Sequence, residues 1–204
     1  MIFFDKSIHE YSTITDGKYI RLPSVTQLLE AVGLIKGMEY VDPLYSERGT
    51  EVHAMTELMD QGCFIPEYCS DSALPFVLQY EKFLQEHEVE YVKTEELVYN
   101  DSLFYAGILD RLWYIDGKLH LTDIKTGKKA RTNVLQLVLY WMCLEEKNVA
   151  LSNLYLTEDG YKLHTWKERP VAFCEAICQI YWFTRPRDYK ILGGKDVLDY
   201  ASCE

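Results

Sequence analysis

The sequence predicts an α/β fold in which helices flank a mixed sheet, and three observations support this. Three runs have the alternation and residue types of strands, at roughly 90–99, 103–115 and 118–125. The dipeptide Asp116-Gly117 between the last two runs is typical of a two-residue hairpin turn. Helical patterns stand before and after these runs, and another strand follows. The expected order is helix, three antiparallel strands, helix, strand, within a single domain of 204 residues.

The first segment of this domain, residues 1–88, is expected to add an N-terminal hairpin and helices. Residues 2–22 alternate loosely and predict a β-hairpin with its turn at Asp16-Gly17. Ser24 is expected to cap a helix that ends near Gly33. Three more elements are predicted in this segment: a loop over 34–43 and helices over about 44–61 and 72–87.

The rest of the chain is expected to complete the sheet and to end in a helix. The predicted elements are a helix over about 132–147, strands at 149–156 and 161–167, and a helix at 170–184. Residues 89–167 would then hold the sheet and its helix. Residues 168–204 would hold the last helix and a weakly patterned tail.

The composition indicates a protein without a membrane span or an export signal. No apolar run approaches the length needed to cross a bilayer, and the N-terminus lacks a signal peptide's long apolar stretch. The six cysteines form no tight framework and are expected to be reduced thiols of a cytoplasmic protein. Because no Cys-x-x-Cys pair exists, no structural zinc is expected.

Two acidic residues and a lysine are expected to meet on one face of the predicted hairpin. If Asp116-Gly117 is the turn, counting outward places Asp110 opposite Asp123, where two carboxylates would repel each other. A cation between them would remove that repulsion, and oxygen ligands suit Mg²⁺ or Mn²⁺. Lys125 lies two residues beyond Asp123 and so shares its face. This combination favours metal-assisted attack of water on a phosphodiester.

Four motifs in a fixed order give the chain a family resemblance. They are Gly49-Thr50-Glu51-Val52-His53, Gly107 to Asp110, Asp123-Ile124-Lys125-Thr126-Gly127, and Gln136 to Tyr140. This set resembles the PD-(D/E)XK nuclease superfamily in its RecB-like exonuclease branch, although the first motif carries one extra residue. The opening Pro23-Ser24-Val25-Thr26 is similar to phage-encoded exonucleases and to the mitochondrial genome maintenance exonuclease.

The resemblance implies a fold, a set of metal ligands and a catalytic lysine. The fold would be the restriction-endonuclease-like αβββαβ core. The implied ligands of one or two Mg²⁺ or Mn²⁺ ions are His53, Asp110, Asp123 and the backbone carbonyl of Ile124. Asp110, Asp123 and Lys125 would be catalytic, with Lys125 polarising the attacking water. Because no cysteine precedes His53, the iron–sulfur cluster of some relatives is not expected.

A wider set of residues is expected to support the metal site or to contact DNA. Glu57 lies one helical turn after His53 and could accept a hydrogen bond from its other ring nitrogen. Ser24 and Thr26 are first of all a helix cap, to which the resemblance adds a phosphate contact. The remaining members are Glu95, Gln136, Tyr140, Lys128, Lys129 and Arg131.

The expected function is that of a metal-dependent DNA exonuclease that prefers single-stranded ends, in recombination, repair or phage genome processing. Its compartment would be the cytoplasm of a bacterial or phage-infected cell. Two alternatives stay open: a catalytically silent module that binds DNA ends or a protein partner, and an endonuclease of the same fold. The net charge of −11 argues against nonspecific adhesion to DNA. It implies modest affinity, a protein partner that supplies affinity, or threading of one strand through a narrow passage.

Overall fold

The computed structural model describes residues 2–15, 17–35 and 43–185. Its centre is a five-stranded sheet in the order β4-β5-β6-β7-β8. The strands are β4 (Val89–Asn100), β5 (Tyr105–Ile115), β6 (Lys118–Lys125), β7 (Ala150–Leu156) and β8 (Tyr161–Trp166). The pair β6–β7 is parallel and the other pairs are antiparallel, so the sheet is mixed, as expected.

The hairpin of β5 and β6 has the predicted register. Asp116 and Gly117 have φ of 50° and 77°, the left-handed conformation that a tight two-residue turn requires. Ile115 therefore pairs with Lys118, and the pairing continues outward to Arg111 and Thr122. The pairing of β5 and β6 ends there, so Asp110 and Asp123 each lie one residue beyond the last paired residues.

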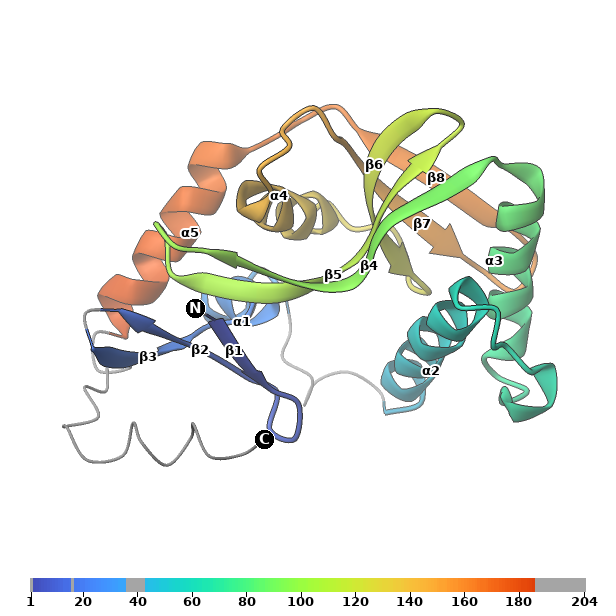
Figure 1. The fold of residues 1–204 in the computed structure, drawn as a ribbon, viewed down its shortest axis with the longest axis horizontal. Helices are drawn as coiled ribbons and strands as arrows, with labels where there is room; N and C mark the ends of the chain where they lie inside the picture. The colour runs from blue at the N-terminus through green and yellow to red at the C-terminus, as the bar shows by residue number, and fades with distance from the viewer. Residues whose placement is uncertain (1, 16, 36–42, 186–204) are drawn as a thin grey trace.

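Helices cover both faces of the sheet (Figure 1). On one face α1 (Val25–Ala31), α4 (Asn133–Cys143) and α5 (Val171–Thr184) enclose a core that includes Leu109, Leu121 and Leu151. On the other face lie α2 (Pro43–Asp60) and α3 (Leu74–Glu86), with a short 3-10 helix, η2 (Pro66–Tyr68), between them. This second core contains Val52, Trp113 and Ile124. Successive residues of β6 thus face different layers.

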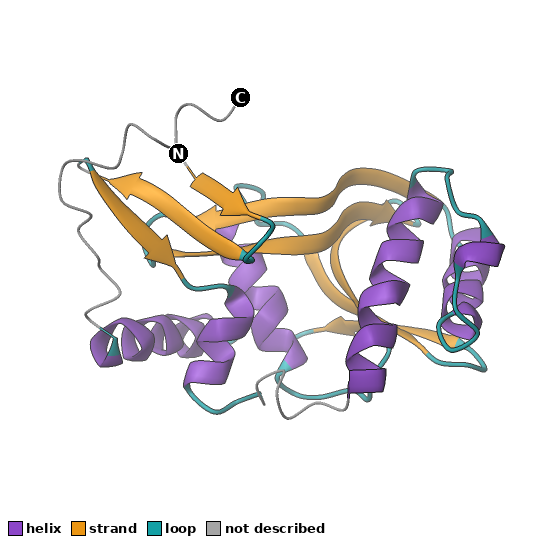
Figure 2. Cartoon of the chain, turned by 90° about the horizontal axis from the view of Figure 1, so that it is seen from below, coloured by secondary structure: helices purple, strands orange, loops and turns teal. Residues whose placement is uncertain are grey.

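The N-terminal segment forms a three-stranded sheet where a hairpin was expected. Its strands are β1 (Ile2–Asp5), β2 (Glu10–Thr15) and β3 (Lys18–Leu22), in the order β1-β2-β3. This sheet packs against the outer part of β4 and β5 through a small core around Tyr11 and Leu22 (Figure 2). Of the predicted turn, Asp16 lies outside the described residues.

The helix boundaries agree with the expected ones except at the end of α4. Ser24 caps α1 in a capping box with Gln27, because each side chain accepts a hydrogen bond from the other residue's backbone N–H. The helix α4 ends at Cys143 and not near Lys147, since the Lys147 ammonium donates to carbonyls in its last turn. The predicted loop beyond residue 35 and the tail beyond residue 185 lie outside the described residues. Within those residues, no helix combines the length and apolar character that crossing a bilayer requires.

Candidate metal centre

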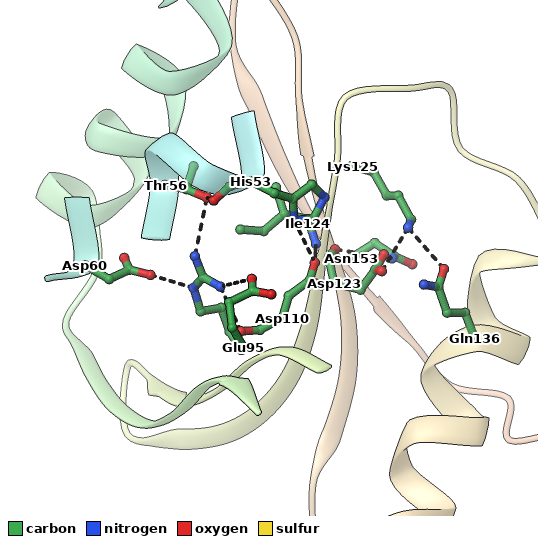
Figure 3. A network of polar contacts seen from close by, with 11 residues as sticks. His53, Thr56, Asp60, Glu95, Asp110, Asp123, Ile124, Lys125, Gln136 and Asn153 are labelled. Carbon is green, nitrogen blue, oxygen red and sulfur yellow. Dashed lines mark hydrogen bonds and ion pairs between the residues drawn. The ribbon is translucent and has the colours of Figure 1, made fainter. Parts of the chain in front are cut away.

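Three side chains from three elements converge where α2 lies next to β4 and β5. His53 on α2, Glu95 on β4 and Asp110 on β5 each offer a ligand atom, and these atoms all lie within 4.8 Å of one another. His53 Nδ1 is 3.5 Å from Asp110 Oδ2. The same Asp110 oxygen accepts a hydrogen bond of 2.7 Å from the backbone N–H of Ile124 (Figure 3). One imidazole nitrogen and two carboxylates in this arrangement could hold a metal ion.

Glu95 reaches the group through an unusual backbone conformation. Its φ is 47°, in the left-handed region that residues other than glycine seldom adopt. Strained residues of this kind tend to lie at functional sites, where the surrounding structure holds them in place. Burial and the nearby Asp110 carboxylate raise the pKa of Glu95 to about 7, against the opposing effect of Arg111. The group therefore carries negative charge that the protein compensates only in part, a situation that a bound cation would relieve.

A buried arginine holds Glu95 in this position. The Arg111 side chain is 0% exposed, and its Nη1 donates to Glu95 Oε1 at 2.8 Å and to the Asp110 carbonyl at 2.8 Å. Its Nη2 donates to Thr56 Oγ1 at 3.3 Å, and its Nε pairs with Asp60 Oδ2 at 2.5 Å. Arg111 thus joins α2 to β4 and β5 around the candidate ligands.

Asp60 completes this network at the end of α2. Its other oxygen, Oδ1, accepts hydrogen bonds from the hydroxyls of Tyr80 and Tyr91, at 2.6 and 2.7 Å. A buried carboxylate is tolerated only when it is paired and hydrogen-bonded, and Asp60 meets both conditions. The last turn of α2 is therefore fixed to α3 and β4 by the same residue that anchors Arg111.

Asp123 and Lys125 form a second polar group on the α4 side of the sheet. Lys125 Nζ donates to Asp123 Oδ1 at 2.8 Å and to Gln136 Oε1 at 3.0 Å. Asn153 on β7 donates to Asp123 Oδ2 at 2.6 Å and itself accepts from Trp166 Nε1 at 2.7 Å. In Figure 3, Asp110 belongs to the group on the α2 side and Asp123 to the group with Lys125 and Asn153.

The charges of this second group depend on each other. Burial raises the pKa of Asp123 to about 6, while Lys125 opposes that shift and the Asp110 carboxylate adds to it. Burial by itself would lower the pKa of Lys125, but the carboxylates of Asp123 and Asp110 outweigh it and raise that pKa. The lysine is therefore an ammonium ion at neutral pH, placed beside the candidate metal centre.

Several sequence predictions about this region are confirmed. Asp123 and Lys125 share a face, and the side chain of Ile124 is buried on the other face. Gln136 lies beside Lys125, in agreement with the place in the site that the resemblance implied. Tyr140 is buried and lies against Gly107, where an added Cβ would stand 2.7 Å from its ring. Glycine at 107 is thus required by packing.

Other predicted contacts are absent or different. The predicted group was His53, Asp110 and Asp123. In the structure the third member of the group is Glu95, and Asp123 lies outside it. Glu57 accepts from Gln61 at 3.2 Å, and no hydrogen bond or ion pair joins it to His53 within the described residues. Glu57 therefore does not orient the imidazole: its carboxylate pairs one helical turn further along α2, away from the imidazole of His53.

Within the described residues, no hydrogen bond or ion pair joins the remaining predicted side chains to either polar group. Ser24 is a buried helix cap and Thr26 is exposed in the first turn of α1. Lys128, Lys129 and Arg131 are exposed in the segment after β6, and the Lys129 ammonium lies 4.7 Å from the ring centre of Trp166. For Ile124 the contact with Asp110 is made by the N–H. The role of its carbonyl stays a prediction.

Sequence reasoning missed Arg111, Asp60 and Asn153. A signal existed for Arg111, because a charged residue directly after Asp110 in a strand of apolar neighbours has no solvated face available. Asp60 and Asn153 gave no such signal. Their partners are remote in the sequence.

Comparisons with known proteins add little to this geometry. No family model and no curated protein matches the chain. One similar solved structure is described as "Crystal structure of SSO0001"; it is 16% identical, the match covers 78% of this chain and 84% of that one, and the TM-score is 0.37. A likeness at this level carries no argument about function.

Proposed function

We propose that this protein is a divalent-metal-dependent DNA nuclease of the PD-(D/E)XK superfamily, in the RecB-like branch, acting as an exonuclease on single-stranded ends. The observation that carries the proposal is the meeting of His53, Glu95 and Asp110 within 4.8 Å, next to the pair Asp123–Lys125. A silent binding module would have no need for an ammonium ion beside clustered carboxylates. The topology of five strands with helices on both faces is compatible with the αβββαβ core.

In this proposal each group has a distinct task. His53, Glu95 and Asp110 would hold Mg²⁺ or Mn²⁺. The Asp123 carboxylate and the Ile124 carbonyl, which lie outside that group, would be further ligands only in the loaded protein. A cation held there would lower the pKa of a water molecule and would stabilise charge on the phosphate oxygens. Lys125 places a positive charge where negative charge develops on the scissile phosphate. Gln136 and Asp123 keep its ammonium in place until substrate arrives, and Asn153 fixes the orientation of the Asp123 carboxylate.

The test is a cleavage assay on end-labelled DNA, single- and double-stranded, linear and circular, with Mg²⁺, Mn²⁺ or EDTA. We expect degradation of linear single strands with metal, slower attack on blunt duplex, and almost none on circular single strands. Rapid cutting of circular single strands would replace the exonuclease by an endonuclease of the same fold. If no substrate is cleaved with either metal, the nuclease proposal is wrong and the silent binding module is the alternative that stands.

Two substitutions tie the activity to this site. Asp110→Asn and Asp123→Asn should each abolish cleavage and leave the fold intact, because both replacements keep the side-chain shape. Asp101→Asn, in the turn between β4 and β5, is a matched control that removes an exposed carboxylate and should retain full activity. Equal activity of all three variants would place the cleavage elsewhere.

A further inference from the structure

A groove of about 1010 Å³ lies on the elements that carry the candidate site, α2 and the end of β6. Its lining includes Thr126 and Gly127, which follow Lys125 at the end of β6, and Arg48, which lies on α2 five residues before His53. The two walls meet where Gly49 of α2 lies against Thr126: a Cβ built at Gly49 would be 3.6 Å from the Thr126 hydroxyl. The groove continues along the ends of β7 and β8.

The lining of this groove is cationic in a protein that is acidic as a whole. Its cationic side chains are Arg48, Lys128, Lys129 and Lys162, and its carboxylates are Glu158 and Asp159. None of the four cations forms an ion pair within the described residues. Against a net charge of −11, such a local excess of positive charge is the electrostatic pattern of a site for an anionic chain.

The guanidinium of Arg48 is positioned by aromatic contacts, and one of its nitrogen atoms lacks a hydrogen bond in the described part of the chain. Its guanidinium carbon lies over two aromatic rings, 4.4 Å from the ring centre of Phe76 and 5.0 Å from that of Tyr45. Its Nε is buried and has no hydrogen-bond partner within the described residues. Within the described residues Arg48 also makes no ion pair, and a phosphate oxygen is an acceptor that the terminal nitrogens of a guanidinium bind well.

Aromatic rings also line the groove, and one of them is open to solvent. Tyr45 is 57% exposed, whereas Phe76 is buried beneath Arg48. Exposed rings in a cationic groove can stack on unpaired bases, which a duplex keeps inside its own stack. The combination therefore favours a single strand over a duplex and over an acidic protein segment, for which an aromatic platform has no base to meet.

We infer that this groove, centred on Arg48, binds the single-stranded DNA segment that flanks the scissile phosphate. The inference rests on the proposed nuclease function for the identity of the ligand, and it goes beyond that function by naming the path of the strand. The strand would run from the metal centre past the end of β6 and between α2 and the β7–β8 turn. Arg48 and Lys162 would contact its phosphates, and Tyr45 would stack on a base.

The experiment measures binding in EDTA, so that cleavage cannot interfere. The probe is a fluorescent oligothymidylate of about 12 nucleotides, within the ~4–16 nucleotide footprints usual for single-strand grooves. Arg48→Gln and Lys162→Gln should each raise the Kd several-fold and reduce the slope of log K against log salt by about 0.7, the value for one phosphate contact on a single strand. Tyr45→Ala should weaken binding by at least about fivefold through lost stacking.

Matched controls separate this result from general effects of charge and folding. Lys118→Gln removes an exposed positive charge at the opposite end of β6 and should leave the Kd unchanged. Lys162 is itself exposed, so its substitution keeps the test valid if Arg48→Gln disturbs packing. Binding by the groove variants that equals binding by Lys118→Gln would overturn the inference. The inference would also be overturned if the groove variants lost affinity for a blunt duplex to the same extent. Displacement of the probe by polyglutamate as effectively as by unlabelled oligonucleotide would overturn it too.

The outcome is distinguishable from that of the proposed function. Cleavage with Mn²⁺ together with unchanged groove binding would refute the path and keep the nuclease. Binding lost in the groove variants, with no cleavage by the unmodified protein under any metal, would support the groove and refute the nuclease.

Discussion

Lys125 is held at one side of the candidate metal centre by an acidic partner and an amide. Asp123 supplies the charge that keeps the lysine protonated, and Gln136 fixes the direction of its ammonium. A lysine that is already positioned in the resting protein costs little reorganisation during reaction. Lys125 should therefore contribute more to the rate of turnover than to the affinity for metal.

Lys125→Ala should lower kcat by about 10²–10³, the usual effect of losing one preorganised electrostatic group. The affinity for Mn²⁺ should stay close to that of the unmodified protein, because the ammonium is not a ligand. Single-turnover cleavage and Mn²⁺ titration monitored by electron paramagnetic resonance measure the two quantities. Lys118→Ala is the control at the other end of β6. Lost metal affinity with normal turnover at saturating Mn²⁺ would show that the assigned role is wrong.

The raised pKa of Glu95 predicts that the stability of the metal-free protein depends on pH. Its pKa is raised from 4.5 to about 7, so between these values the folded state binds more protons than the unfolded state. The contribution of Glu95 to stability is therefore lost as pH rises through this window. Each pKa unit corresponds to about 1.4 kcal/mol.

The corresponding measurement is urea denaturation of the unmodified protein and Glu95→Gln across this pH range. The free energy of unfolding of the variant, minus that of the unmodified protein, should increase from pH 4.5 to about 7. His120, whose pKa burial lowers to about 4, contributes a trend of opposite sign. That trend is common to both proteins and cancels in the difference. A difference that is constant with pH would contradict the raised pKa.

At the scale of elements, α2 is fastened to the sheet by Arg111. The guanidinium bridges Asp60 in the last turn of α2 and Glu95 on β4, and all its polar contacts are made inside the protein. His53 lies two helical turns before Asp60 on the same helix, so the network that fixes the end of α2 also sets the distance from His53 to Asp110.

Arg111→Met should destabilise the fold by about 3–5 kcal/mol, because it leaves the Asp60 carboxylate buried without a cation. The double variant Arg111→Met/Asp60→Asn should recover part of that loss, since the amide retains an acceptor for Tyr80 and Tyr91. Lys93→Met breaks an exposed ion pair with Glu96 and should cost no more than about 1 kcal/mol. Urea midpoints at constant pH give the comparison. Equal losses for Arg111→Met and Lys93→Met would mean that Arg111 contributes no more to stability than an exposed ion pair does.

The chain is acidic overall, and a groove in the described part of it is lined by four cationic side chains and two carboxylates. Long-range attraction to duplex DNA is weak at a net charge of −11, so any binding has to come from contacts near the site. The candidate metal centre joins a helix of one layer to two strands of the sheet. A bound cation should therefore stabilise the fold as a unit.

Mn²⁺ at about 100 times its Kd should stabilise the protein by about 2.7 kcal/mol. At the ~2–4 °C per kcal/mol usual for a domain of this size, the Tm should rise by several degrees. Calorimetry of the unmodified protein and of Asp110→Asn, with Mn²⁺ and with EDTA, measures it. The shift should vanish in Asp110→Asn, and a shift of the same size there would place the metal elsewhere.

Features of the fold that depend on local periodicity could be predicted from the sequence. Asp116-Gly117 fixed the turn, and the turn fixed the register that puts Asp123 and Lys125 on one face and Ile124 on the other. Ser24 marked the start of α1 because its capping box is formed within four residues. The order of helices and strands followed in the same way, since each pattern is read within a few turns or strand residues.

Which charged groups meet depends on how the elements pack in three dimensions. Positions 53, 95 and 110 are brought together by packing of α2 on β4 and β5, which no local pattern encodes. The left-handed conformation of Glu95 and its contact with Arg111 turn an acidic strand residue into a candidate ligand. Asp60 and Asn153 find their partners across layers and strands. Buried polar groups must be satisfied by whatever lies next to them in space, and that depends on the whole fold.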